Sequence, residues 1–148
     1  MNAIRAAPAG SVVCALLVLL VACSPDCTPV VRDGWVRWLP IDMPMTAGFG
    51  RIDNPCRTPV TIVAASSPRF AGISLHETRS DEGISRMRAV PELLVPAGET
   101  VVLQPGVLHL MLMQPQSALQ QGETIQIDFV LKDGGTLRGA MTVRAQAP

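Results

Sequence analysis

Residues 124–144, TIQIDFVLKDGGTLRGAMTVR, decide the fold class of this protein. Every second residue from 125 to 131 is apolar, and the residues at 124, 126 and 128 are polar. A period of two is typical of a β-strand with one buried face, whereas a helix repeats after about 3.6 residues. Asp133-Gly134-Gly135 then supplies a tight turn. The stretch therefore predicts an antiparallel β-hairpin.

Similar short strands are predicted along the rest of the chain. Apolar stretches alternate with Gly, Pro, Asn or Asp about every ten residues, which is typical of a β-sandwich. The 13 Pro and 12 Gly residues are scattered and form no repeat. The predicted strands are Gly34–Leu39, Ala47–Asp53, Val60–Ser66, Gly72–Thr78, Ile84–Val90, Thr100–Gln104, Val107–Met113, Thr124–Lys132 and Thr136–Arg144. We therefore expect an all-β fold, a single antiparallel β-sandwich, with Trp35 and Trp38 in packing roles.

The composition argues against nucleic-acid binding and against catalysis. The chain has 148 residues, 48% of them apolar, and its 12 Lys and Arg residues balance 12 Asp and Glu residues. No run of basic residues marks a phosphate-binding surface, so we expect no nucleic-acid partner. The two His residues have no triad pattern around them, and no phosphate-cradling or calcium-binding loop is present. We expect a binding protein and not an enzyme.

The N-terminal residues resemble a bacterial lipoprotein signal. Arg5 is the only charged side chain before Asp26, and residues 12–22 form an apolar run. That run is too short to cross a bilayer, which takes about 20 residues, but it suits a secretory signal. Leu20-Val21-Ala22-Cys23 resembles the lipobox, in which a diacylglyceryl group is attached to the Cys sulfur and the chain is cut before it. The alternative is an ordinary signal peptide in which Cys23 is incidental.

This interpretation divides the chain into a signal peptide at 1–22, a lipidated linker at 23–32 and a folded domain at 33–145. It predicts a lipid-anchored protein on the periplasmic side of a Gram-negative cell membrane. Ser24 follows the lipidated Cys, where Asp would resemble an inner-membrane retention signal. The outer membrane is therefore favoured.

Two cysteines remain for a disulfide after processing. Cys14 leaves with the signal and Cys23 carries the lipid, so Cys27 and Cys56 are left in an oxidising compartment. A bridge between them would close a loop of about 28 residues and stabilise the fold by about 3–4 kcal/mol. Two free thiols or a metal-binding pair are the alternatives, although this spacing matches no thiolate metal motif.

Residues 107–113, VLHLMLM, place chemistry on one face of a predicted strand. Alternation divides this segment into a leucine stripe and a polar-and-sulfur stripe: Leu108, Leu110 and Leu112 against His109, Met111 and Met113. If the leucines fill the core, an imidazole and two thioethers stand together on the opposite face. The alternative is a strand buried on both faces, in which Met fills gaps.

His76 occupies a similar position on an earlier strand. Ile73 and Leu75 alternate with His76, and Met87 lies on the next predicted strand. A two-residue turn at Asp81-Glu82 would place His76 directly across from Met87, whereas a bulge at Gly83 would shift the pairing by one and separate them. Imidazole and thioether donors without thiolate or carboxylate suit Cu(I) best. Thioethers also form no disulfides in an oxidising compartment.

The spacing of His76, Met87, His109 and Met111 is H-x(10)-M-x(21)-H-x-M, which resembles the motif of the periplasmic copper chaperone family PCu(A)C. Flanking segments also resemble this family: Thr46-Ala47-Gly48-Phe49-Gly50 before Asn54, Ser74-Leu75-His76-Glu77, Met87-Arg88, Val95-Pro96-Ala97-Gly98-Glu99 and His109-Leu110-Met111-Leu112-Met113. The resemblance covers residues 33–143. It implies a cupredoxin-like Greek-key sandwich that binds one Cu(I) through these four residues. We expect the site to be exposed, near one end or edge of the sandwich.

The resemblance also implies that the protein delivers copper towards cytochrome c oxidase assembly. Its partner would be a copper-acceptor protein, either a subunit of the oxidase or another copper chaperone. Residues 145–148 stand where family members often carry a His- and Met-rich extension associated with Cu(II), so that second site is not expected.

Three further methionines are candidate accessory ligands: Met43, Met45 and Met113. For the first two, which flank Pro44, loop packing is the alternative.

Three other functions remain open. A blue-copper electron carrier needs a Cys thiolate with two His, and the strand region has no Cys. A structural lipoprotein would bind no metal, and a copper-buffering or resistance protein would use the same ligands as a chaperone.

Overall fold

The computed structural model describes residues 27–145, and every regular element in that part is a β-strand. The predicted signal peptide and the lipidation of Cys23 lie outside the described residues. The strands are β1 (Val30–Arg37), β2 (Met45–Asp53), β3 (Val60–Ser66), β4 (Phe70–Asp81), β5 (Ile84–Ala89), β6 (Leu93–Val95), β7 (Thr100–Leu103), β8 (Leu108–Pro115), β9 (Thr124–Leu131) and β10 (Thr136–Arg144). Residues 27–145 contain no helix long and apolar enough to cross a bilayer.

All nine predicted strands are present, and the predicted all-β fold is confirmed. Two bounds matter. The first strand begins at Val30, where Val30 pairs with Asp53 and Val31 pairs with Ile52, so the folded part starts ahead of the predicted residue 33. The strand Leu93–Val95 was not predicted, because its three residues are too few to show a period of two.

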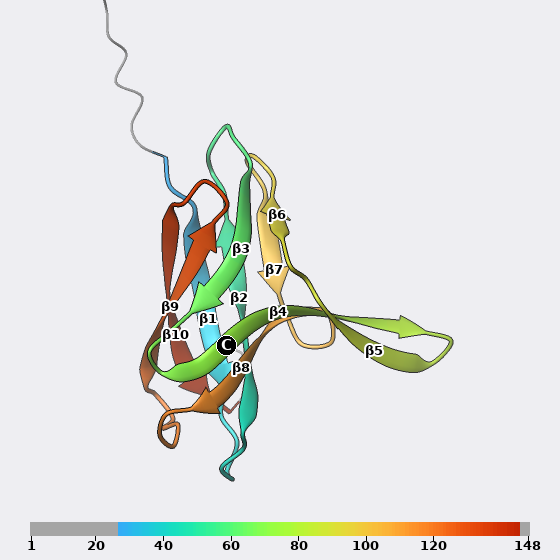
Figure 1. Ribbon diagram of the computed structural model, residues 1–148, viewed down its shortest axis with the longest axis vertical. Coiled ribbons are helices and arrows are strands. Elements are labelled where there is room, and N and C mark those ends of the chain that lie inside the picture. The colour runs from blue at the N-terminus through green and yellow to red at the C-terminus, as the bar shows by residue number, and fades with distance from the viewer. Residues whose placement is uncertain (1–26, 146–148) are drawn as a thin grey trace, which may run out of the picture.

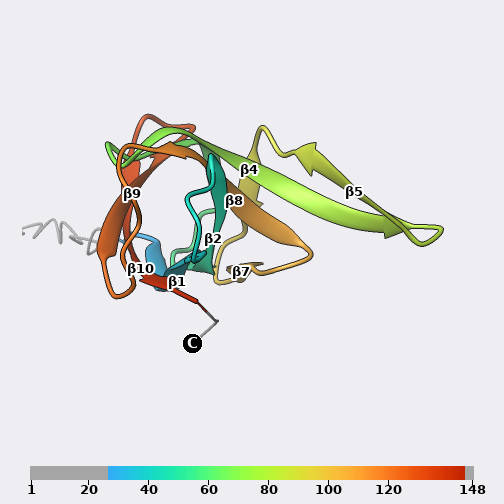
Figure 2. The same ribbon diagram turned by 90° about the horizontal axis from the view of Figure 1, so that it is seen from below.

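Seven strands close into a barrel in the order β4-β8-β2-β1-β10-β9-β3, with β3 returning to β4 (Figures 1 and 2). Closure depends on the pairing of Ala65 with Ile73. The predicted sandwich is therefore closed into a barrel, because β3 and β4 at its edges pair with each other. One pairing, β1 with β10, is parallel, and the others are antiparallel. The β4–β5 hairpin projects from the barrel wall, as Figure 2 shows.

The barrel interior is filled by the inward-facing residues that alternate along each strand. Among the largest fully buried side chains are Ile52, Ile62, Leu110, Leu112, Ile127, Phe129 and Met141. The hairpin at 124–144 forms as predicted, with Phe129 paired to Leu137 and Ile127 to Gly139. Trp35 is buried and Trp38 half-buried, and the indole Nε1 of Trp38 donates a hydrogen bond to the carbonyl of Leu119. Both tryptophans therefore pack, as expected.

A disulfide joins Cys27 to Cys56, the pair singled out in the sequence. It ties the segment ahead of β1 to the connection between β2 and β3. Asn54 fixes the same connection from inside: its amide donates to the carbonyls of Thr58, Val95 and Pro96, and its Oδ1 accepts from the Cys56 N–H. The start of the domain is thereby held to the barrel covalently and by buried hydrogen bonds.

Candidate metal centre

The predicted alternation of β8 places its donors on the outside of the barrel wall. Leu110 and Leu112 are fully buried in the core, whereas Met111 is half-buried and Met113 exposed. His109 also points outward, yet only 5% of it is exposed. The imidazole is covered by side chains on the outer face and not by the core.

The pairing of β4 with β8 brings the two imidazoles together. His76 lies directly opposite His109, and Ser74 lies opposite Met111. The ring centroids of the two histidines are 6.3 Å apart, with an angle of 36° between the rings. A metal–nitrogen bond is about 2.1 Å and a ring nitrogen lies about 1.1 Å from its centroid, so two rings on opposite sides of one ion have centroids about 6.4 Å apart. The observed separation therefore permits both rings to hold one ion.

The hydrogen bonds of the two rings leave one nitrogen lone pair free on each. His109 Nδ1 lies 3.1 Å from the Val107 carbonyl, which can only accept, so Nδ1 carries the proton and Nε2 keeps its lone pair. His76 Nε2 lies 3.0 Å from Ser74 Oγ, and this contact suits a protonated Nε2 donating to the hydroxyl. His76 Nδ1 is then an acceptor that is buried without a hydrogen-bond partner. Such atoms are uncommon in folded proteins and are candidates for ligation.

Burial also favours the neutral form of His76. Desolvation lowers the pKa of the His76 imidazole, and the neighbouring His109 lowers it further through charge repulsion. Only the neutral ring can bind a metal through its free nitrogen.

The predicted pairing of Met87 directly across from His76 is wrong. The turn of the β4–β5 hairpin is Glu82-Gly83, one residue later than predicted, so Met87 pairs with Thr78 and His76 pairs with Ala89. Both turn residues have positive φ, 49° and 79°, as a type I′ turn requires, and glycine adopts this conformation without strain. The partner of His76 thus moves by two positions. A shift of two preserves the face, so Met87 remains on the side of His76, diagonally from it.

A cavity of about 290 Å³ opens on this outer face. Met87, His109 and Met111 line it, together with Met45 and Phe49, and His76 adjoins it through His109. Residues 27–145 hold no cluster of three or more His, Cys, Asp or Glu side chains suited to a metal ion. The sulfur-bearing side chains in the lining of this cavity are Met45, Met87 and Met111.

A row of rings supports the imidazoles. Trp35 and Phe49 have ring centroids 4.5 Å apart, Phe49 lies 6.4 Å from His109, and the Arg37 guanidinium carbon sits 5.1 Å from the centre of the Phe49 ring. Phe49 therefore flanks His109 on the outer face, and both residues line the same cavity. Sequence analysis did not assign this role to Phe49 or the hydrogen bond to Ser74, although both residues belong to segments that resemble the PCu(A)C family.

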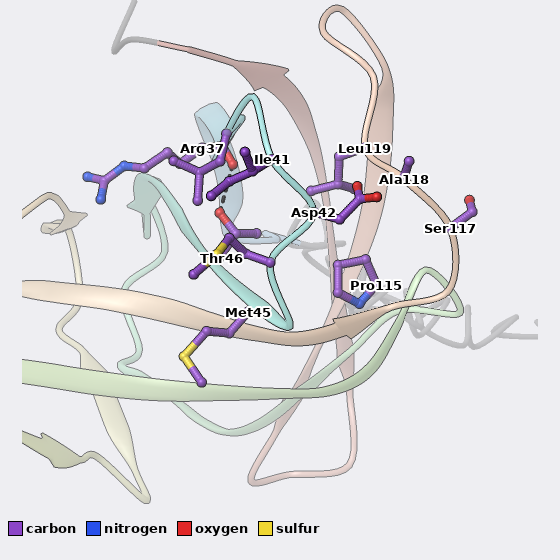
Figure 3. A pocket seen from close by; sticks show the side chains of 11 residues that line it. Arg37, Ile41, Asp42, Met45, Thr46, Pro115, Ser117, Ala118 and Leu119 are labelled. Carbon is purple, nitrogen blue, oxygen red and sulfur yellow. Dashed lines mark hydrogen bonds between the residues drawn. The ribbon is translucent and has the colours of Figure 1, made fainter.

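The candidate accessory methionines lie close by. Met45 pairs directly with Met113 on the neighbouring strand. Met43 and Met45 line a second cavity of about 240 Å³, shown in Figure 3, where the Thr46 hydroxyl donates to the Arg37 carbonyl.

Comparison with known proteins places the chain in a family. Residues 30–143 match the family described as "Putative lipoprotein LpqE-like". This chain belongs to the LpqE-like family. The chain is similar to Lxx21020 of Leifsonia xyli subsp. xyli, named as a lipoprotein, with 35% identity over 115 residues covering 77% of this chain and 68% of the relative. RP573 of Rickettsia prowazekii is 34% identical over 73 residues, 49% of this chain and 40% of that protein. The family description and the name of Lxx21020 agree with the predicted lipid anchor.

Solved structures share the barrel of this LpqE-like protein. The Cu(I) form of DR1885 from Deinococcus radiodurans is 31% identical, with a TM-score of 0.63 over 85% of this chain and 83% of that chain. The apo PCuAC domain of PmoF1 has a TM-score of 0.67 at 19% identity, over 82% of this chain and 98% of that chain, and shows the fold alone. The predicted relation to the PCu(A)C family is confirmed.

Proposed function

We propose that this LpqE-like protein binds one Cu(I) ion through His76, Met87, His109 and Met111 and transfers it to an acceptor protein. The observation that carries the proposal is the direct pairing of the two imidazoles across β4 and β8, with one unprotonated nitrogen on each. Uncharged imidazole and thioether donors select a soft monovalent ion. The existence of a Cu(I) form of DR1885, at 31% identity, supports the same ion here.

The strand arrangement suits transfer. His76, His109 and Met111 stand on adjacent strands of the barrel wall, so the backbone ladder holds their positions. Met87 stands on the projecting hairpin and is 52% exposed. An acceptor ligand can displace Met87 while the other three donors still hold the ion. This order of exchange favours a metallochaperone over a copper-buffering protein and requires no catalytic step.

We further propose that the ion goes to a copper-acceptor protein of cytochrome c oxidase assembly, either an oxidase subunit or another copper chaperone. The resemblance to PCu(A)C supports this route. A lipid on Cys23 would keep the protein at the periplasmic side of the membrane, and the absence of Asp after Cys23 favours the outer membrane.

An anaerobic Cu(I) titration against a competing chelator tests the proposal. Ascorbate serves as the reductant, and a thiol count verifies that the Cys27–Cys56 disulfide stays intact. We expect a tight stoichiometry of one, and Met111→Leu should weaken binding by about tenfold, or about 1.4 kcal/mol. Met141→Leu is the matched control, since Met141 is a core residue and loses the same sulfur. Unchanged affinity in Met111→Leu would overturn the ligand set, and an intensely blue Cu(II) form would support the electron-carrier alternative.

A further inference from the structure

Met45 and Met113 form a pair of exposed thioethers next to the proposed copper centre. They lie directly opposite each other on β2 and β8, so their side chains leave the same outer face. Ala47 and Met111 form the next pair on that face, two residues along both strands. The sulfur-bearing side chains therefore continue from Met111 towards the end of the barrel.

Met45 also lies between two cavities. It lines the cavity of about 290 Å³ that contains His109 and Met111, and it lines the adjoining cavity of about 240 Å³ that contains Met43. Figure 3 shows Met45 beside the second cavity, with its sulfur directed away from Pro115 and Leu119. A ligand passing between the two cavities meets the thioether of Met45.

The loop that carries Met43 is held against this pair. The N–H of Gln114, the residue after Met113, donates a 2.6 Å hydrogen bond to the carbonyl of Pro44. Met43 and Met45 flank that Pro44, so the bond places both beside the end of β8.

Packing accounts for only part of these side chains. Met45 is 45% exposed and Met43 is 43% exposed. Met113 is 37% exposed, and its ε-methyl group lies over Gly72. Each side chain still leaves much of its apolar surface in water. The charged residues nearby have opposite signs: Arg37 lines both cavities and Asp42 lines the second. Three uncharged sulfur donors without imidazole would bind Cu(I) more weakly than a mixed site.

We propose that Met45 and Met113, joined by Met43 from the loop, form a second and weaker Cu(I) site through which the ion passes to and from the four-ligand centre. The proposal rests on the proposed function. Movement between the sites is ligand exchange: copper–thioether bonds to Met43, Met45 and Met113 form as the copper–imidazole bonds to His76 and His109 and the copper–thioether bonds to Met87 and Met111 break. The ion remains Cu(I), and no electron or proton is transferred.

Cu(I) titration of the full chain, followed by NMR of the Met ε-methyl groups, tests this site. The first equivalent should shift the methyl signals of Met87 and Met111. A second equivalent should shift those of Met45 and Met113. Met45→Leu/Met113→Leu should bind only the first equivalent and release it to a chelator at least about threefold more slowly. These changes conserve volume and should cost little stability.

The outcomes separate the two proposals. If excess Cu(I) leaves the Met45 and Met113 methyl signals unmoved, or if the double variant still binds two equivalents, the second site is refuted and the four-ligand centre stands. If Met87 and Met111 do not respond to the first equivalent, the proposed function fails. In His76→Ala, a methyl shift at Met45 without tight binding supports a separate thioether site. Met141→Leu should behave as the wild type throughout.

Discussion

Removal of the Cys27–Cys56 disulfide should destabilise the domain by an amount that can be worked from the chain. The bridge closes a loop with a sequence separation of 29 residues. Chain-entropy arguments assign such a loop about 12 cal/mol/K, or about 3.6 kcal/mol at 25 °C. A folded region of 119 residues, 27–145, has an unfolding entropy of about 250 cal/mol/K. The expected fall in Tm is therefore about 14 °C for Cys27→Ala/Cys56→Ala.

Thermal unfolding followed by circular dichroism and calorimetry measures this shift. The wild type treated with a thiol reductant should reproduce the loss, because reduction opens the same loop without changing side chains. The single variant Cys27→Ala is a control for the buried site, since Cys56 is the more buried partner. A Tm change below about 3 °C in both the variant and the reduced wild type would show that the N-terminal segment adds nothing to the constraint.

Three further results are expected. Gly83→Ala should destabilise the fold by about 1–2 kcal/mol, because Ala is strained at a φ of 79°, and it should weaken Cu(I) binding by disturbing the β4–β5 hairpin that carries Met87. Gly98→Ala is the control: its φ is 72° and the space around it is equally open, so it should lower Tm by the same amount but leave Cu(I) binding unchanged. Hydrogen bonds from Arg69 hold the pKa of Glu123 below its ordinary 4.5, so this pair should stabilise the fold fully above pH 4.5 and lose its effect as the pH falls. In urea unfolding, Glu123→Gln should therefore lose about 1–2 kcal/mol of stability at pH 7 and nothing at low pH. An equal loss at both pH values would contradict the assignment. Phe49→Leu should lower Cu(I) affinity several-fold by loosening the buried imidazole, with Met141→Leu as control; unaltered affinity would remove the ring row from the site.

Local patterns carried most of the strand assignments. Apolar residues recur at every second position from Ile125 to Leu131 because one face of β9 is buried, and this period can be seen in the sequence of the strand itself. The alternation of leucine and sulfur on β8 was predicted in the same way. The strand at Leu93–Val95 was not predicted because it is too short to show the two-residue period. The hairpin register failed because the choice between Asp81-Glu82 and Glu82-Gly83 depends on turn conformation.

The amino-acid order alone determined the all-β class, the side of β8 on which the donors stand and the motif spacing, since each follows from the two-residue repeat of an extended chain or from counting. Tertiary structure alone decided that His76 lies opposite His109, that Phe49 flanks His109 and that Met45 lines two cavities. These relations arise where β4, β8 and β2 pair across tens of residues of intervening chain. Strand neighbours are chosen by closure of the whole barrel, in which every strand must satisfy its hydrogen bonds and bury its apolar face at once.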